Sequence, residues 1–155
     1  SSNIKKYTKI IGFDNDKIDF YYQRAWATIS RNNEGIARHK HHQSHISFAY
    51  YLKKSKNDGT LNLHNSAMQN EITTGAFNPI TSGKFFKMNL FNTNIIEFSP
   101  EVDEIYIFPS KTMHSTSQNK TTGERISISA DVSVVAKNSE NMEFVLTPIN
   151  KWKKF

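Results

Sequence analysis

Four of the six histidines of this chain lie within seven consecutive positions, in the segment RHKHHQSHISFAYYL that begins at Arg38. His39 and His41 are two residues apart, so on an extended chain their side chains point to the same side, while His42 points to the other. Two imidazoles in this arrangement at the entrance of a strand can chelate one metal ion. Short histidine-rich runs also occur as solvated loops, and the cluster alone leaves both interpretations open.

A second candidate segment, residues 104–132, contains one more histidine and a cation. An alternating strand is expected to end near Phe108, His114 follows it, and Arg125 opens another alternating strand. Two antiparallel strands joined by the intervening loop would bring His114 and Arg125 to the same end of a barrel. A metal ligand beside a fixed cation is what a chelating acid with a distal carboxylate requires.

Composition limits the chemistry that is open to the chain. Cysteine is absent, which excludes disulfides, thiolate nucleophiles and Fe–S clusters, so any metal must be held by nitrogen and oxygen. The net charge of +6 is compatible with phosphate contacts, but the lysines are scattered and follow no nucleic-acid-binding motif. Nucleic acid is therefore not the favoured partner.

The termini and apolar runs predict where the protein resides. No apolar run is long enough to cross a bilayer, and the N-terminal segment lacks the apolar core of a signal peptide, so we expect a cytoplasmic protein without a membrane partner. Because the chain opens on Ser-Ser rather than methionine, we also expect that a tag remnant or a trimmed segment lies at its start.

Strand signals dominate the elements that must position these residues. Seven short segments are β-branched or aromatic and mostly alternate, and turn residues such as Asn57-Asp58-Gly59 separate them. Only residues 14–24 have a weak helical pattern. The predicted protein is all-β with minor helix, folded as a double-stranded β-helix, or jelly-roll, barrel. The predicted strands are residues 24–30, 45–52, 60–64, 94–98, 104–108, 125–135 and 143–147.

The length of 155 residues predicts a single domain spanning residues 1–155. Residues 65–93 interrupt the strand pattern, because they are rich in Asn, Thr and Gly and have no clean period. A segment of this length in a compact domain is usually functional or mobile. We predict a lid or substrate-facing insertion, and a disordered connector is compatible with the same composition.

The order of these local pieces resembles that of the Fe(II)- and 2-oxoglutarate-dependent oxygenases, and most closely the small prolyl-hydroxylase-like proteins, many of them encoded by marine phages. The likeness covers roughly residues 22–136. RAWATISRNNEGIARHKHHQSHISFAYYL resembles the Trp-containing strand, the histidine motif and the Tyr-Tyr-Leu strand of that family. IFPSKTMHSTSQNKTTGERISIS resembles its distal segment, in which a histidine is followed by Arg-x-Ser.

The resemblance implies a set of site residues. In that family iron sits on two histidines and one carboxylate, which leaves three coordination positions for 2-oxoglutarate and dioxygen. His39 matches the first ligand, His114 matches the distal ligand, and His41 occupies the position where most of the family has a carboxylate. The residues that match the contacts of the 2-oxoglutarate C5 carboxylate are Arg125, Ser127 and Tyr51.

His41 is the main departure from the family pattern. Three neutral imidazoles would hold Fe(II) with one negative charge fewer, and imidazole suits nickel, copper and zinc as well as iron. The alternative is that His41 lies beside the metal, or in solvent, with the third ligand elsewhere or absent.

The function implied by the resemblance is that of a Fe(II)- and 2-oxoglutarate-dependent dioxygenase, with ascorbate as an auxiliary reductant. Analogy with prolyl hydroxylases favours hydroxylation of a protein or peptide. Three alternatives remain: an inactive jelly-roll binding or virion-associated module, a cupin-type enzyme with three histidines and no 2-oxoglutarate, and nucleic-acid binding without catalysis. For a phage-encoded protein the expected location is the host cytoplasm.

Overall fold

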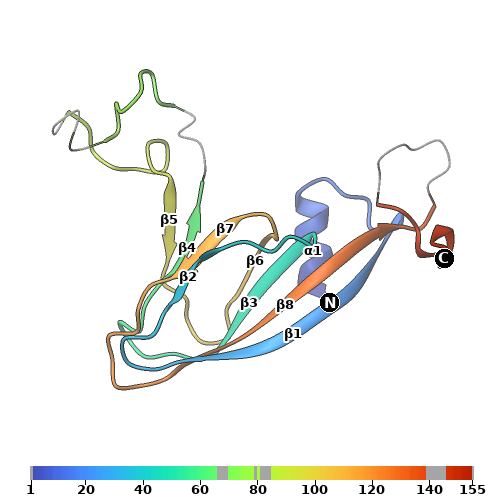
Figure 1. Cartoon of the computed structure of the whole chain (residues 1–155), viewed down its shortest axis with the longest axis horizontal. Coiled ribbons are helices and arrows are strands. Elements are labelled where there is room, and N and C mark those ends of the chain that lie inside the picture. Colours follow the sequence, from blue (N-terminus) through green and yellow to red (C-terminus); the bar gives the residue numbers. More distant parts are fainter. Residues whose placement is uncertain (1, 66–69, 79, 81–84, 139–145, 155) are drawn as a thin grey trace.

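A computed structural model of the chain describes residues 2–65, 70–78, 80, 85–138 and 146–154. In this part of the chain an N-terminal helix is followed by eight strands and a short 3-10 helix (Figure 1). Neither helix is both long and apolar enough to cross a membrane. The elements are α1 (Ser2–Ile10), β1 (Ile18–Ser30), β2 (Ile36–His39), β3 (Ile46–Lys53), β4 (Leu61–His64), β5 (Ile95–Phe98), β6 (Ile105–Pro109), β7 (Met113–Thr116), β8 (Arg125–Ala136) and η1 (Ile149–Lys151).

The eight strands pair antiparallel in two four-stranded sheets. The first sheet has the order β1-β8-β3-β6 and the second has the order β2-β7-β4-β5. The first strand therefore lies beside the last, and the second beside the seventh, which is the connectivity of a jelly roll. The prediction of an all-β protein with minor helix and a jelly-roll barrel is confirmed.

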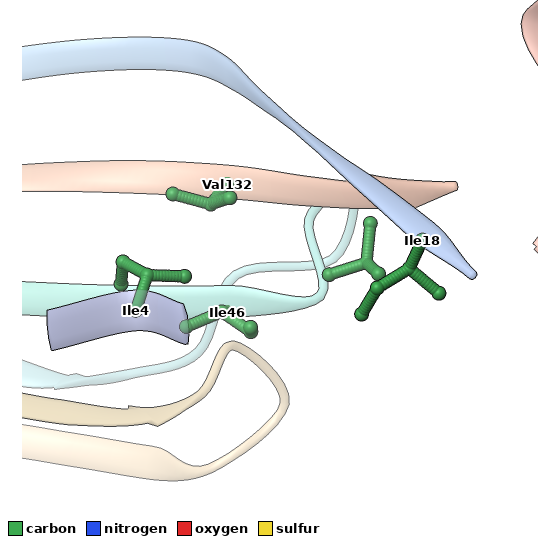
Figure 2. Packing of buried hydrophobic residues seen from close by; sticks show 5 residues of the cluster. Ile4, Ile18, Ile46 and Val132 are labelled. Atoms are coloured by element: carbon green, nitrogen blue, oxygen red, sulfur yellow. The ribbon is translucent and has the colours of Figure 1, made fainter. Parts of the chain in front are cut away.

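Helix α1 packs against the outer face of the first sheet. Ile4 of α1 forms a buried cluster with Ile18, Ile46, Val132 and Val134 (Figure 2). Side chains alternate along a strand, so burying even-numbered residues of β8 in this cluster directs its odd-numbered residues toward the second sheet. The odd-numbered face of β8 carries the charged residues discussed below.

A bulge in β1 lets this strand bury side chains on both faces of the sheet. Its register shifts between Tyr22 and Arg24. Before the shift, Phe20 pairs with Val134 and packs against the helix-covered cluster. After the shift, Trp26 pairs with a residue of the odd-numbered face of β8. Without the extra residue both aromatic rings would lie on the same side of the sheet.

The structure corrects three expectations about secondary structure. Residues 14–24, predicted as weakly helical, form a turn and the first part of β1, because their aromatic and β-branched side chains pair with β8. The helix precedes them instead, and β2 and β7 are strands that the pattern did not predict. Residues 143–145 of the predicted final strand lie outside the described residues.

Candidate metal centre

Three histidines from two distant segments meet at one end of the barrel. His39, the last residue of β2, pairs directly with His114 of β7, and His41 lies in the loop that follows β2. The ring centroids are 4.2 Å apart for His39 and His114, 5.3 Å for His39 and His41, and 5.1 Å for His41 and His114. One ring nitrogen from each residue lies within 4.8 Å of the other two. Small side-chain rotations would allow one ion to contact all three.

The rings of His39 and His114 are held through Nδ1 by backbone carbonyls. His39 Nδ1 lies 2.8 Å from the Ala37 carbonyl oxygen, and His114 Nδ1 lies 2.9 Å from the Thr112 carbonyl oxygen. A carbonyl oxygen only accepts hydrogen bonds, so the proton of each neutral ring sits on Nδ1 and the lone pair on Nε2. This tautomer is the one that ligates a metal through Nε2.

The ring of His41 is held by a buried carboxylate. His41 Nδ1 lies 2.5 Å from Oδ1 of Asp131, a residue only 1% exposed. Ser47 donates to the same oxygen at 2.6 Å, and Arg24 Nε donates to Oδ2 at 2.6 Å. Burial alone would raise the pKa of Asp131, but the hydrogen bonds from Ser47, Arg24 and His41 together lower it. The carboxylate is therefore ionised at neutral pH, and His41 also presents Nε2 to the cluster.

Burial determines the protonation of His114. Its buried position lowers its pKa to about 4, and the neighbouring imidazoles of His39 and His41 add to the lowering, against the opposing effect of its carbonyl partner. His114 is neutral at ordinary pH. Neutral imidazole is the form that binds a divalent metal ion.

Arg125 places a buried cation close to the histidine cluster. It is 3% exposed, and its Nη2 donates to Thr116 Oγ1 at 2.9 Å. Thr116 is two residues beyond His114 on the same face of β7, about 6–7 Å along the strand. Nη1 donates to the Asp58 carbonyl oxygen at 2.8 Å. No carboxylate in the described ranges forms an ion pair with this guanidinium, and a buried cation without an anion is unfavourable.

Tyr51 and Ser127 lie beside Arg125 on the same side of the first sheet. They pair with each other across β3 and β8. Tyr51 is 2% exposed, and burial raises its pKa to about 12 against the opposing charge of Arg125, so its hydroxyl stays protonated. Within the described part of the chain neither hydroxyl has a hydrogen-bond partner. A hydroxyl without a protein partner is normally satisfied by water or by a ligand.

Gly59 provides the space for the Arg125 guanidinium. Its φ of +104° lies in the region that favours glycine, and a Cβ at this position would lie 2.5 Å from Arg125 Nη1. The same Cβ would lie 2.7 Å from the Ser117 carbonyl oxygen, which also accepts a hydrogen bond from Nη1. A glycine is therefore needed where the chain passes the cation.

A cleft of about 500 Å³ adjoins the histidine cluster. Arg24, Lys40, His42 and Asp131 contribute to its lining, together with His41. Of the three clustered histidines, His41 is the one that lines the cleft. Because Asp131 is engaged by Arg24 and His41, the free charges of this lining are positive.

The other histidines have separate roles. His42 lines the cleft and does not join the cluster. His45 Nδ1 accepts a hydrogen bond from the Val134 backbone N–H at 2.9 Å. His64 Nε2 lies 2.8 Å from Ser115 Oγ.

The sequence pattern did not reveal the partners that hold the site residues. The alternation of side chains along β8 places Asp131 on the same face as Arg125 and gives no sign of its contact with His41. This contact depends in addition on the path of the loop that contains His41. The contact of Thr116 is not visible in the sequence pattern either, because its hydroxyl accepts a hydrogen bond from Arg125, which belongs to the other sheet.

Comparison with known families agrees with this architecture. The family model described as putative 2OG-Fe(II) oxygenase matches residues 24–131, which include the three histidines and Arg125. The chain therefore belongs to the 2OG-Fe(II) oxygenase family. The resemblance inferred from the sequence motifs is confirmed, and Fe(II) and 2-oxoglutarate are the cofactors that define the family.

Solved structures share the fold at low sequence identity. A 2OG-Fe(II) oxygenase family oxidoreductase from Burkholderia pseudomallei has a TM-score of 0.59 and 11% identity, covering 83% of this chain and 50% of that one. A prolyl-4-hydroxylase from Pseudomonas putida has a TM-score of 0.52 and 12% identity, covering 85% of this chain and 61% of that one. The chain thus spans only about half to three-fifths of the length of these two proteins. No curated protein matches the chain.

Proposed function

We propose that the chain is a Fe(II)- and 2-oxoglutarate-dependent dioxygenase with His39, His41 and His114 as its metal ligands. The observation that carries this proposal is the convergence of three imidazoles, whose ligand nitrogens lie within 4.8 Å of one another and whose Nδ1 atoms are each engaged by another group. Three nitrogen donors suit Fe(II), and they also suit nickel and zinc. The donor set therefore fits the metal of the family, without the carboxylate that is usual there.

Arg125, Tyr51 and Ser127 are the proposed contacts of the far carboxylate of 2-oxoglutarate. Among the described residues the buried guanidinium has only neutral acceptors, and a carboxylate there would supply the missing negative charge. Tyr51 and Ser127 pair on the same face of the first sheet as Arg125, and their hydroxyls, which have no hydrogen-bond partner among the described residues, are the proposed further donors. Ala49 and Ser129, which pair across β3 and β8 between this end and the metal end, are small enough to leave room for the chain of the acid.

When bound, Fe(II) and 2-oxoglutarate supply the oxidation: dioxygen is activated, succinate and carbon dioxide are formed, and a C–H bond of the substrate is hydroxylated. The residues of the chain orient the reactants and exclude water. Arg125 fixes one end of the co-substrate, and the histidines fix the geometry of the other end. The cleft beside His41 is the side from which a substrate reaches the centre.

Residues 65–93 are the proposed substrate-facing insertion of a single domain spanning residues 1–155. The segment leaves β4 after His64, which pairs with Met113 next to His114, so it emerges at the metal end of the barrel. Its described parts extend away from the sheets beyond β4 and β5 (Figure 1). They expose large apolar side chains, with Ile72 at 92% and Phe85 at 94%. These side chains, and the fold shared with a prolyl-4-hydroxylase, support a peptide or protein substrate by analogy.

Formation of succinate from 2-oxoglutarate tests the proposed activity. The parent protein with Fe(II) and ascorbate is expected to form succinate slowly even without substrate, whereas His114→Ala is expected to lose this turnover by at least about 100-fold. In parallel, 2-oxoglutarate should raise the melting temperature of the metal-loaded parent but not that of Arg125→Gln.

The alternatives predict different results in the same experiments. A binding module without turnover would be stabilised by metal and 2-oxoglutarate and form no succinate. A cupin-type enzyme with three histidines would bind metal and show no stabilisation by 2-oxoglutarate. Either result contradicts the dioxygenase proposal.

A further inference from the structure

We propose that Asp131 is a positioning residue of the metal centre, which orients His41 and supplies through its ring the negative charge that three imidazoles lack. The inference rests on the proposed function, because it takes the three histidines as metal ligands. It assigns a role to a carboxylate that is absent from the ligand set but touches one of its members.

The position of Asp131 is set by strand pairing. It lies in β8 directly opposite Ser47 of β3, and Ser47 donates to the Oδ1 atom that also contacts His41 Nδ1. The ring of Trp26 packs at a tilt against that of His41, with ring centroids 5.6 Å apart. The backbone N–H of His41 donates to the Ser110 carbonyl oxygen at 2.9 Å. The imidazole is therefore fixed by a sheet residue, an aromatic ring and its own backbone.

His41 differs from the other two histidines in the charge of its Nδ1 partner. Their partners are neutral carbonyls of residues two positions earlier in the chain, at Ala37 and Thr112. The partner of His41 is an ionised carboxylate from another element. An anion at Nδ1 increases the electron density at Nε2 and strengthens the bond from that nitrogen to a metal. The carboxylate thus acts through the ring instead of binding the ion directly.

Arg24 stabilises the negative charge of the buried Asp131 carboxylate. Its Nε donates to Asp131 Oδ2, so the two carboxylate oxygens have separate partners and Oδ1 stays directed at His41. The Arg24 side chain is 61% exposed, and its guanidinium lies 4.8 Å from the centroid of the Trp26 ring. A solvent-facing cation of this kind keeps the carboxylate charged without occupying the face that meets the imidazole.

The first experiment measures metal affinity in the absence of turnover. Co(II) is titrated into metal-free parent and Asp131→Asn protein in competition with a chromophoric chelator. The variant is expected to bind Co(II) about 10–100-fold more weakly and to shift the Co(II) absorption bands. Asp103→Asn is the matched control, because Asp103 also accepts a hydrogen bond, from Tyr50 at 2.6 Å, but is exposed and does not touch the histidines. Unchanged affinity and spectrum in Asp131→Asn overturn the proposal.

A second experiment separates this role from a purely structural one. His41→Asp places a carboxylate at the ligand position, where Asp131 has no imidazole to polarise and instead repels its neighbour. In that background Asp131→Asn is expected to leave Co(II) affinity unchanged or to raise it. An equal loss of affinity in both backgrounds would show that Asp131 only supports the fold, and would overturn the proposal.

Two further outcomes are distinguishable. If Asp131→Asn does not fold, the double variant Arg24→Gln/Asp131→Asn removes both charges of the pair and is expected to show the same loss of Co(II) affinity. If the parent itself binds no Co(II), the proposed ligand set is wrong, and the inference fails with it. A parent that binds Co(II) with Asp131→Asn unaffected rejects only the role of Asp131.

Discussion

The Arg125 guanidinium donates a 2.9 Å hydrogen bond to the hydroxyl of Thr116, and Thr116 lies two residues from His114 on the same face of β7. A residue of the first sheet is thus tied to the strand of the second sheet that carries a candidate metal ligand. The separation between cation and metal ligand is therefore determined by one short strand and one hydrogen bond. A rigid separation suits an acid that must be held at both ends.

Thr116→Val is expected to weaken the binding of 2-oxoglutarate while leaving metal affinity intact. The valine keeps the shape but removes the acceptor, and loss of one hydrogen bond to a charged group corresponds to about 10-fold in affinity. Titration calorimetry of the metal-loaded protein measures the change. A parallel loss of Co(II) affinity would contradict this assignment. The variant also leaves the Ile36 N–H without its 2.9 Å side-chain acceptor, so a lower melting temperature is expected.

Gly59→Ala is expected to displace the Arg125 guanidinium and to abolish most of the stabilisation by 2-oxoglutarate. Gly12→Ala is the matched control: Gly12 has a φ of +95°, and its added Cβ would meet nothing within 4 Å. Both variants carry a similar backbone penalty of about 1–2 kcal/mol. The melting-temperature shift caused by 2-oxoglutarate should be lost in the first and kept in the second. Equal shifts in the two variants would show that the guanidinium does not hold the co-substrate.

Asp58→Asn is expected to destabilise the fold strongly. The carboxylate is completely buried, lies 2.7 Å from Lys54 Nζ, and accepts a 2.7 Å hydrogen bond from the Ser55 backbone N–H. Breaking a buried ion pair from one side costs about 3–5 kcal/mol. Urea denaturation of the metal-free protein measures the free energy of unfolding.

An exposed ion pair provides the comparison for Asp58. Lys53 Nζ lies 3.4 Å from Glu124, and the two side chains are 56% and 37% exposed. Glu124→Gln is therefore expected to change the free energy of unfolding by at most about 1 kcal/mol. Similar losses in the two variants would contradict the distinction between the buried and the exposed pair.

Tyr51 is expected to titrate late and to make stability sensitive to alkaline pH. Burial raises its pKa to about 12 in the folded protein, above the value of an exposed tyrosine. The folded state holds this proton more tightly, so the contribution is complete below about pH 10 and is lost as pH rises toward 12. Absorbance near the phenolate band should show a late-titrating tyrosine that Tyr51→Phe removes. Tyr106, whose pKa is also raised to about 12 by burial, should remain in the variant.

The sequence predicted the parts of the fold that local patterns determine. Strands β3 and β8 alternate over many residues and are bounded by turn residues, so their existence was predictable. The four-residue strands β2 and β7 were not, because they are stabilised by pairing with each other across a long stretch of chain. The local sequence does not reveal the bulge before Arg24 either, although this bulge determines on which face of the sheet Trp26 lies.

The candidate site likewise has residues that the sequence predicted and residues that it did not. Residue types and order indicated His39, His41 and His114 as one group and Arg125 as another, because these side chains carry recognisable chemistry. The groups that hold them are ordinary serine, threonine and aspartate residues. Ser47, Thr116 and Asp131 acquire their roles from the register of β3 and β8 and from the facing of the two sheets, which no single segment encodes.

The positions of the three imidazoles affect how firmly the two sheets are held together. His39 and His114 belong to the second sheet, while His41 is attached to the first sheet through Asp131. An ion bound by all three would cross-link the two layers at this end. Removal of the ion by a chelator should therefore let the layers separate there first, with amide hydrogen exchange accelerating in β2 and β7 while the long β1–β8 ladder remains protected.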